Sequence, residues 1–286
     1  MATDDKVICV IGATGNQGGS VARRFRKAGF SKLAIEGIEV VKVDLDNVDS
    51  LISVFHGANV IFSVTNYWEP FFRPDYRQKT EELGISCRKL ASDAEYQQGK
   101  NVADAAAATV DANGFLVSTL SHAGKCSQGA FTELYHFDAK VDIFPIYVQD
   151  KYPELASKMS CVQTGFFFTS FNTSCPTHTS ASFQMAFTAS PDKPVPHLVP
   201  VGDMGNFVYA VYQMPAGKEY MAEGTTCSWS GWIKTWGSVT GLPVSYRQVS
   251  AEEMIDMTGN RDTGIEVANM FSYGSDPGYD GGVYLF

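Results

Sequence analysis

Residues 6–19 have the sequence Lys6-Val7-Ile8-Cys9-Val10-Ile11-Gly12-Ala13-Thr14-Gly15-Asn16-Gln17-Gly18-Gly19, a short apolar run followed by glycines spaced G-x-x-G-x-x-G. Residues 20–28 then predict a helix that ends at Gly29. In Rossmann-type folds this order of strand, glycine turn and helix points the positive end of the helix at a pyrophosphate. Gly12 would permit the tight turn, Gly15 would let the phosphates approach the backbone, and Gly18 would let helix and strand pack closely. A glycine-rich turn without a ligand is the alternative, but the strand and the helix that the motif requires are both predicted here.

Strand-like and helical runs alternate through the first half of the chain, which is typical of a parallel α/β sheet. Further strands are predicted at 39–43, 59–64, 115–118 and 160–164, and further helices at 48–55, about 96–109 and 136–147. This order predicts an α/β fold with a Rossmann-type, doubly wound parallel sheet over residues 1–164. After Gly165 the chain is richer in Ser, Thr and Pro, so residues 165–286 predict a smaller C-terminal α+β domain over the strand ends. Part of the Rossmann sheet can return within that domain.

Composition argues against several classes of protein. The chain has 22 Lys and Arg against 31 Asp and Glu, a net charge of −9, so we expect no direct binding of nucleic acid. Its six cysteines are scattered without the spacing of a zinc site, and we expect no metal. No stretch approaches the roughly 20 apolar residues of a membrane span, and no apolar signal region is visible at the N-terminus. We therefore expect no membrane association and a cytoplasmic protein.

Five motifs along the chain resemble one known family. They are GATGNQGGSVAR at 12–23, TNYWE at 65–69, QGK at 98–100, HFDAK at 136–140 and VANMF at 267–271. In this order, over nearly the whole chain, they resemble the NmrA-like family, a branch of the atypical short-chain dehydrogenase/reductases. The resemblance implies an NAD(P)-binding Rossmann domain, a small C-terminal domain, and a preference for NADP(H) over NAD(H). Some members are reductases, whereas others are non-enzymatic regulators or redox sensors.

The resemblance also implies which residues bind the cofactor. The pyrophosphate would be held by Gly12, Thr14, Gly15, Asn16, Gln17 and Gly18. The adenine would lie beside Asp44 and Leu45, and the nicotinamide ribose would be bordered by Thr65, Asn66 and Tyr67. Further cofactor contacts would come from Lys100, Lys140, Gly165 and Phe168, with Lys140 on the ribose hydroxyls and the last two beside the nicotinamide.

Catalytic short-chain reductases carry a Tyr and a Lys spaced Y-x-x-x-K, which places both on one face of a helix. Here the position four residues before Lys140 is His136, and Tyr135 would point about 100° away. His136 could act as the general acid, because imidazole titrates near neutrality; the alternative is that it only packs or forms a hydrogen bond. Ser118, at a strand end, takes the place of the hydroxyl that orients the carbonyl, and a turn-forming serine is the alternative.

The chain departs from the family pattern in two places. Too few residues separate Gly29 from Gly37 for the family's second strand, which ends in the arginine that pairs with the 2′-phosphate of NADP. A missing strand would leave an exposed edge beside the first strand, so we favour a mobile loop left out after Gly29, and similarly a trimmed end after Phe286. If the segment is truly absent, residues 39–43 must form the second strand, Asp44 becomes the ribose ligand, and NAD(H) becomes the favoured cofactor.

Two functions fit these observations. The intact glycine motif, Lys140, Ser118 and a titratable His136 favour an NADP-dependent oxidoreductase acting on a small carbonyl or conjugated substrate. The missing Tyr and the non-enzymatic relatives favour an NADP(H)-sensing regulator that binds a protein partner, in which case the nucleus is also open. The substrate and the oligomeric state are open at this point.

Overall fold

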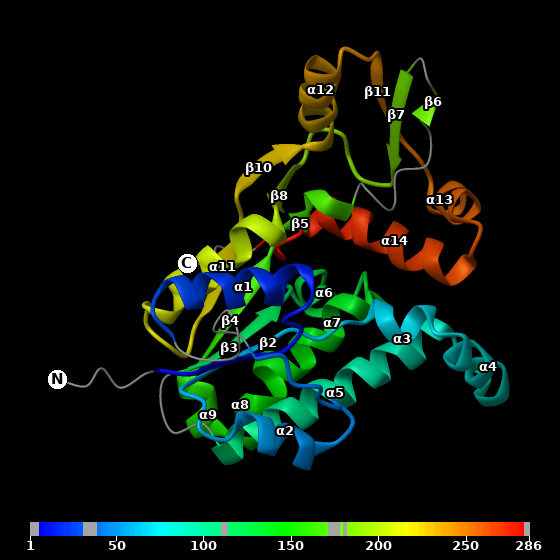
Figure 1. Cartoon of the computed structure of the whole chain (residues 1–286). Coiled ribbons are helices and arrows are strands. Elements are labelled where there is room, and N and C mark those ends of the chain that lie inside the picture. Colours follow the sequence, from blue (N-terminus) through cyan, green and yellow to red (C-terminus); the bar gives the residue numbers. More distant parts are fainter. Residues whose placement is uncertain (1–5, 31–38, 110–113, 171–177, 180–181, 283–286) are drawn as a thin grey trace.

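The computed structural model describes residues 6–30, 39–109, 114–170, 178–179 and 182–282. Its centre is a parallel sheet in the order β1-β2-β3-β4-β9 (Figure 1). The strands are β1 (Ile8–Val10), β2 (Val60–Ser63), β3 (Phe115–Thr119), β4 (Met159–Thr164) and β9 (Glu219–Ala222). Every residue of β2, β3 and β4 is buried, as expected for parallel strands covered on both faces. The predicted α/β fold with a parallel central sheet is confirmed.

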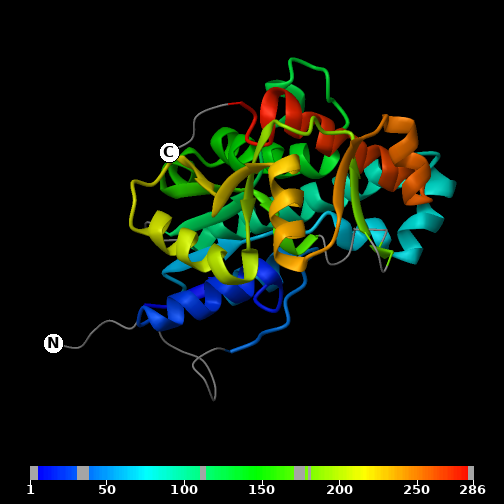
Figure 2. The ribbon, with the colours of Figure 1, turned by 90° about the horizontal axis from the view of Figure 1, so that it is seen from above.

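Helices cover both faces of this sheet. On one face α1 (Asn16–Lys27) and α11 (Pro200–Tyr212) lie side by side (Figures 1 and 2). The two helices can approach closely because Gly205 has no side chain. A Cβ at that position would lie 2.3 Å from the carbonyl oxygen of Ser20. The other face packs against α2 (Val48–Phe55), α5 (Cys87–Thr109), α8 (Val148–Lys151) and α9 (Pro153–Lys158). Asn47 caps α2 by accepting a hydrogen bond from the amide of Ser50 at 3.1 Å.

The remaining elements place polar side chains at the carboxyl ends of the strands. Between β2 and α5 lie α3 (Trp68–Phe72) and α4 (Pro74–Leu83). After β3 come α6 (Ala123–Cys126) and α7 (Tyr135–Val141), and the chain continues from α7 through a segment over Asp142–Tyr147 that is kinked at Phe144. Among the described residues, no helix is both long and apolar enough to cross a membrane.

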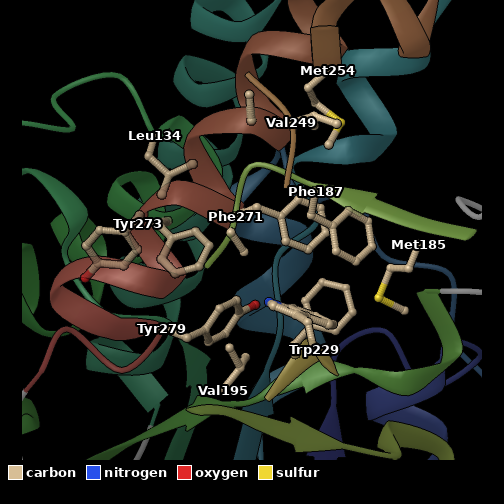
Figure 3. Close-up of a cluster of buried hydrophobic side chains, with 14 of the residues drawn as sticks. Leu134, Met185, Phe187, Val195, Trp229, Val249, Met254, Phe271, Tyr273 and Tyr279 are labelled. Carbon is tan, nitrogen blue, oxygen red and sulfur yellow. The ribbon is translucent and has the colours of Figure 1, made fainter. Parts of the chain in front are cut away.

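The C-terminal part forms a second layer above the central sheet (Figure 1). One small sheet joins β5 (Phe166–Phe167), β8 (Pro194–Leu198) and β10 (Thr225–Ser228), and another joins β6 (His178–Thr179), β7 (Ser182–Phe187) and β11 (Val244–Gln248). The helical segments are η2 (Phe168–Ser170), α12 (Trp229–Thr240), α13 (Ala251–Thr258), α14 (Arg261–Tyr273) and η3 (Gly274–Gly278). Its core is aromatic: the rings of Phe187 and Phe271 stack at 3.8 Å, and Trp229 packs against both (Figure 3).

The division at residue 164 stays a prediction, since the chain crosses between the two layers. Both α11 and β9 follow Gly165 in sequence, yet α11 packs on α1 and β9 pairs with β4 in the central sheet. The second layer therefore consists of segments that alternate with parts of the Rossmann sheet.

Two sequence predictions were wrong. Residues 39–43 form no strand, and four of the five are exposed, because within the described chain the only ladder partner of β1 is β2. Helix α5 begins at Cys87 rather than near 96, because its first turns are buried through Cys87 and Ala91 and through the ion-paired Arg88 and Glu95, whose charges made the segment look like a polar loop. The predicted loop after Gly29 falls on residues 31–38, which lie outside the described residues, and the predicted continuation after Phe286 stays a prediction because the description ends at residue 282.

Candidate functional site

The glycine loop between β1 and α1 has the backbone geometry that the motif requires. Gly12 has a φ of +70°, in the left-handed region that favours glycine, and its carbonyl accepts a hydrogen bond from the amide of Gly15 at 2.8 Å. A Cβ on Gly18 would lie 2.2 Å from the carbonyl oxygen of Gly12, closer than atoms can approach. The predicted structural roles of Gly12 and Gly18, a tight turn and close helix packing, therefore fit the geometry.

The first turn of α1 is open to an anion. Gly15 is its N-cap and supplies no side-chain hydrogen bond, and the first turn holds no acidic residue. Gly12, Thr14, Gly15 and Asn16 are all exposed. Because the first amides of a helix lack intrahelical partners and carry the positive end of its dipole, this loop fits the pyrophosphate of a dinucleotide.

Ser118, near the carboxyl end of β3, is bonded to the glycine loop. Its hydroxyl donates to Oε1 of Gln17 at 2.7 Å, and Ser118 is buried. This bond joins two predicted site residues that lie 101 positions apart in the chain. In this geometry Ser118 fixes the first turn of α1, and the role of orienting a carbonyl stays a prediction.

Lys140 of α7 reaches the end of the neighbouring strand. Its ammonium donates to the carbonyl oxygen of Thr65 at 3.2 Å and lies 3.4 Å from the Thr65 hydroxyl oxygen. It also forms an ion pair with Glu95 of α5, a fully buried carboxylate that the sequence did not single out. The second oxygen of Glu95 has no partner within the described part of the chain. Lys140 and Thr65, two predicted cofactor residues, are thus in contact at the carboxyl ends of the strands.

His136 is held by a carboxylate from the C-terminal part of the chain. Glu266 of α14 accepts hydrogen bonds from the backbone amide of His136 at 2.9 Å and from its Nδ1 at 2.6 Å. Its other oxygen accepts from Nε of Arg88 at 2.9 Å, and Arg88 also pairs with Glu133. Burial acts to raise the pKa of Glu266, but the contacts with His136 and Arg88 outweigh it and hold that pKa below its usual value.

Aromatic rings surround the other sides of His136. The rings of Tyr67, Trp68 and Phe137 lie 5.7, 5.2 and 4.9 Å from the imidazole. Tyr67 is only 1% exposed, and burial strongly raises the pKa of its hydroxyl. That hydroxyl has no hydrogen-bond partner among the residues described. The ring of Tyr67 therefore belongs to the packing around His136, and its contact with a ribose stays a prediction.

The outer face of α7 lines a separate groove of about 550 Å³ against α5. Tyr135, Asp138 and Asp142 line it together with His122. Asp138 and Asp142 lie 3.1 and 3.4 Å from the His122 ring and raise the pKa of that imidazole to about 9. Tyr135 thus faces away from Lys140, as the one-residue offset from the Y-x-x-x-K spacing predicts.

Three other predicted cofactor residues, Asp44, Leu45 and Lys100, make contacts elsewhere than at the glycine loop and Lys140. Asp44 is exposed, and its carboxylate accepts from the amide of Asp46 at 3.0 Å. The carbonyl of Leu45 accepts from Asn101 of α5 at 2.8 Å. The ammonium of Lys100 lies over the rings of Tyr96 and Tyr147, so no described contact joins it to the glycine loop or Lys140.

Three predicted residues remain. The side chain of Asn66 accepts from the amide of Trp68 at 3.2 Å, which forms a turn just before α3. Gly165 follows β4, and a Cβ there would lie 2.8 Å from the carbonyl of Pro196, so glycine is required by packing. The ring of Phe168 stacks on His197 at 4.7 Å. These contacts leave cofactor binding by Asn66, Gly165 and Phe168 as a prediction.

The sequence analysis missed the buried charges of the site. Arg88 and Glu95 lie seven residues apart on one face of α5, and Glu266 immediately precedes the VANMF motif at 267–271. The signal that could have revealed them was a charged residue within an otherwise apolar helix face. Because a buried charge is seldom found without a partner, such a residue predicts a buried ion pair. The sequence did not reveal which distant helix carries each partner.

Comparison with known proteins agrees with this geometry. A model of the NmrA-like family matches residues 4–283. The NmrA-like family domain-containing oxidoreductase FrzB of Cladobotryum sp is 34% identical over 116 residues, which cover 35% of this chain and only 30% of that protein.

Two solved structures share the fold. NmrA, a negative transcriptional regulator in complex with NAD, superposes with a TM-score of 0.68 at 20% identity, over 99% of this chain and 89% of that one. The NADPH-dependent quinone oxidoreductase QOR2 of Escherichia coli, complexed with NADPH, gives a TM-score of 0.69 at 17% identity, over 97% and 91%. Because the family model spans nearly the whole sequence, the chain belongs to the NmrA-like family.

Proposed function

We propose that this protein binds NADP(H) at the carboxyl ends of β1, β2 and β3. One observation supports the proposal: at these strand ends Ser118 bonds to Gln17 in the open first turn of α1, 101 positions away, and Lys140 contacts Thr65, 75 positions away. Solved structures of the same fold that hold NAD or NADPH support it. Calorimetric titration with NADPH and with NADH tests it and also decides between the two cofactors, and binding of neither by folded protein would refute it.

We further propose an oxidoreductase that reduces a small carbonyl or conjugated substrate. The bound nicotinamide would supply the hydride to carbon. Lys140 would hold the ribose hydroxyls, and His136 would give the proton on Nε2 to the substrate oxygen, so that a carbonyl becomes an alcohol. The imidazole would then regain its proton from water.

The first test concerns Lys140. We expect Lys140→Met to weaken NADPH binding about 10- to 100-fold, because a hydrogen bond to a charged group contributes about 1.5–3 kcal/mol. Tyr135→Phe is the matched control, since Tyr135 lies on the outer face of the same helix and Phe keeps the ring over Arg88. Calorimetric dissociation constants of both variants give the comparison.

Removal of Lys140 leaves Glu95 buried without its ion pair, so a second variant separates folding from binding. Lys140→Met/Glu95→Gln removes both buried charges and keeps the shapes of both side chains. It should fold like the wild type and still bind NADPH weakly. Wild-type affinity in this double variant, or a larger loss in Tyr135→Phe, would contradict the assignment of Lys140 to the ribose.

His136→Gln tests the proton donor. Gln can still donate to Glu266 but cannot transfer a proton, so we expect kcat to fall about 100-fold or more while the dissociation constant for NADPH stays unchanged. The measurement is NADPH consumption against a panel of aldehydes, ketones, quinones and enones. Full activity in His136→Gln would exclude His136 as the acid.

The second candidate function is an NADP(H)-sensing regulator that binds a protein partner, in the cytoplasm or the nucleus. One observation favours it: the side chain of His136 is only 8% exposed and is fully engaged at Nδ1, which suits a packed residue. A sensor would bind NADPH and NADP⁺ yet oxidise no compound of the panel over hours. Turnover of any panel compound by wild type, lost in His136→Gln, decides for the enzyme.

A further inference from the structure

Glu266 is the point at which three helices meet. Three hydrogen-bond donors converge on its two oxygens: Nε of Arg88 from α5, and the backbone amide and Nδ1 of His136 from α7. Glu266 itself belongs to α14 and is completely buried. Both oxygens are satisfied, so the carboxylate is fixed in place rather than free to turn.

This arrangement determines which nitrogen of His136 carries a proton. A carboxylate can only accept hydrogen bonds, so Nδ1, 2.6 Å from Oε1 of Glu266, must be the donor. Nε2 is then the only ring nitrogen available to take up or release a proton in exchange with another molecule. The amide of His136 donates to the same oxygen, which fixes the ring relative to the first turn of α7.

The charged and titratable groups facing the imidazole come from several elements. Arg88 approaches from α5 through Glu266, and the hydroxyl-bearing ring of Tyr67 packs from the segment after β2. Glu133, just before α7, pairs with Arg88, and Lys140 pairs with Glu95 one turn along. Of these groups, only Glu266 forms a hydrogen bond with the imidazole ring. Glu266 is therefore the group that determines which ring nitrogen of His136 is protonated.

We propose that Glu266 is a positioning residue for His136: it holds the proton on Nδ1 and directs proton exchange through Nε2. The proposal rests on the proposed function for the use of that proton in catalysis. It also gives the C-terminal part of the chain a role in the reaction, because α14 supplies the carboxylate that fixes the acid on α7.

Glu266→Gln tests the proposal because an amide has one acceptor oxygen in place of two. If that oxygen serves Arg88, the NH₂ group faces the two donors of His136, and if it turns to His136, the NH₂ group faces Arg88, which keeps only its contacts with Glu133. The Nδ1–H contact should therefore weaken. The negative charge beside the ring is removed as well.

Nitrogen-detected NMR of the imidazole reads the tautomer without any need for turnover. The chain has five histidines, so the signal of His136 is identified by its loss in His136→Gln. In the full-length protein with NADPH bound, we expect the neutral ring to be protonated at Nδ1, and the Nε2–H form to become populated in Glu266→Gln. Asp262→Asn is the control, since Asp262 also links α14 to α5, through the amide of Cys87 at 2.9 Å, but does not touch His136.

Kinetics provide the second readout. The comparison is between the wild type and Glu266→Gln. kcat should fall about 10-fold or more with little change in KM. In the His136→Gln background Glu266→Gln should have no further effect on kcat, because it acts through that residue.

Several results would overturn the proposal. These are an unprotonated Nδ1 in the wild type, an unchanged tautomer in Glu266→Gln, and equal losses of kcat with and without His136. If Glu266→Gln does not fold, Arg88→Met/Glu266→Gln removes both buried charges and is measured in its place. If the wild type turns over no substrate, the enzyme hypothesis fails, whereas the NMR comparison still decides whether Glu266 fixes the ring.

Discussion

Gly15→Val is expected to abolish NADPH binding while leaving the fold intact. The backbone of Gly15 has a φ of −89° and a ψ of 178°, which valine also adopts, and a Cβ there would lie 3.3 Å from the Gly12 carbonyl oxygen, a tight contact that a small shift of the loop relieves. The valine methyl groups would instead fill the space before the first turn of α1, where the pyrophosphate must approach the backbone. Loss of two amide bonds to a charged phosphate, each about 1.5–3 kcal/mol, corresponds to a loss of affinity of about 100-fold or more.

Calorimetric titration with NADPH measures this loss, and circular dichroism and the melting temperature show that the variant is folded. Gly202→Val is the matched control, because Gly202 lies in the exposed first turn of α11 and its nearest contact to a new Cβ would be 3.9 Å away. The control should bind as the wild type does. Wild-type affinity in folded Gly15→Val would mean that the glycine loop does not hold the cofactor.

Arg88→Met is expected to lower the free energy of unfolding by about 3–5 kcal/mol, which is the cost of leaving a buried charge without its partner. The side chains of Arg88 and Glu266 are 4% and 0% exposed, so water cannot replace the lost guanidinium. Chemical denaturation followed by fluorescence measures the change. Arg88→Met/Glu266→Gln should recover most of the loss because it removes both charges, and equal instability of single and double variants would show that packing, rather than charge, dominates.

The carboxylate of Glu266 also makes the free energy of unfolding depend on pH. The pKa of Glu266 is lowered in the folded chain relative to its ordinary 4.5, so its ionised form is bound more tightly in the native state than in the unfolded one. That contribution is present above pH 4.5 and is lost as the pH falls through the lower native pKa. The wild type should therefore lose stability relative to the neutral double variant at acid pH.

The sequence alone determined the parallel α/β fold and the glycine loop that follows its first strand. The spacing of Gly12, Gly15 and Gly18 indicates a turn that only glycine can form, and apolar runs such as 115–118 indicate buried parallel strands. Both patterns are local, so they can be recognised without knowing which distant segments pack against them. The offset of Tyr135 from Lys140 likewise follows from helix geometry and places Tyr135 on the outer face of α7. The failure at 39–43 has the opposite cause, since a strand needs a ladder partner and local pattern does not supply one.

Only the tertiary structure decided how the charges of the site are paired. Glu266 lies 130 residues after His136 and 178 after Arg88, and Glu95 meets Lys140 from 45 residues away. No local pattern encodes such pairs, because each side chain is set by its own helix and the contact arises only when α5, α7 and α14 pack together. The sequence therefore named His136 as a titratable residue, whereas the packing of a C-terminal helix decided which of its nitrogens is left to act.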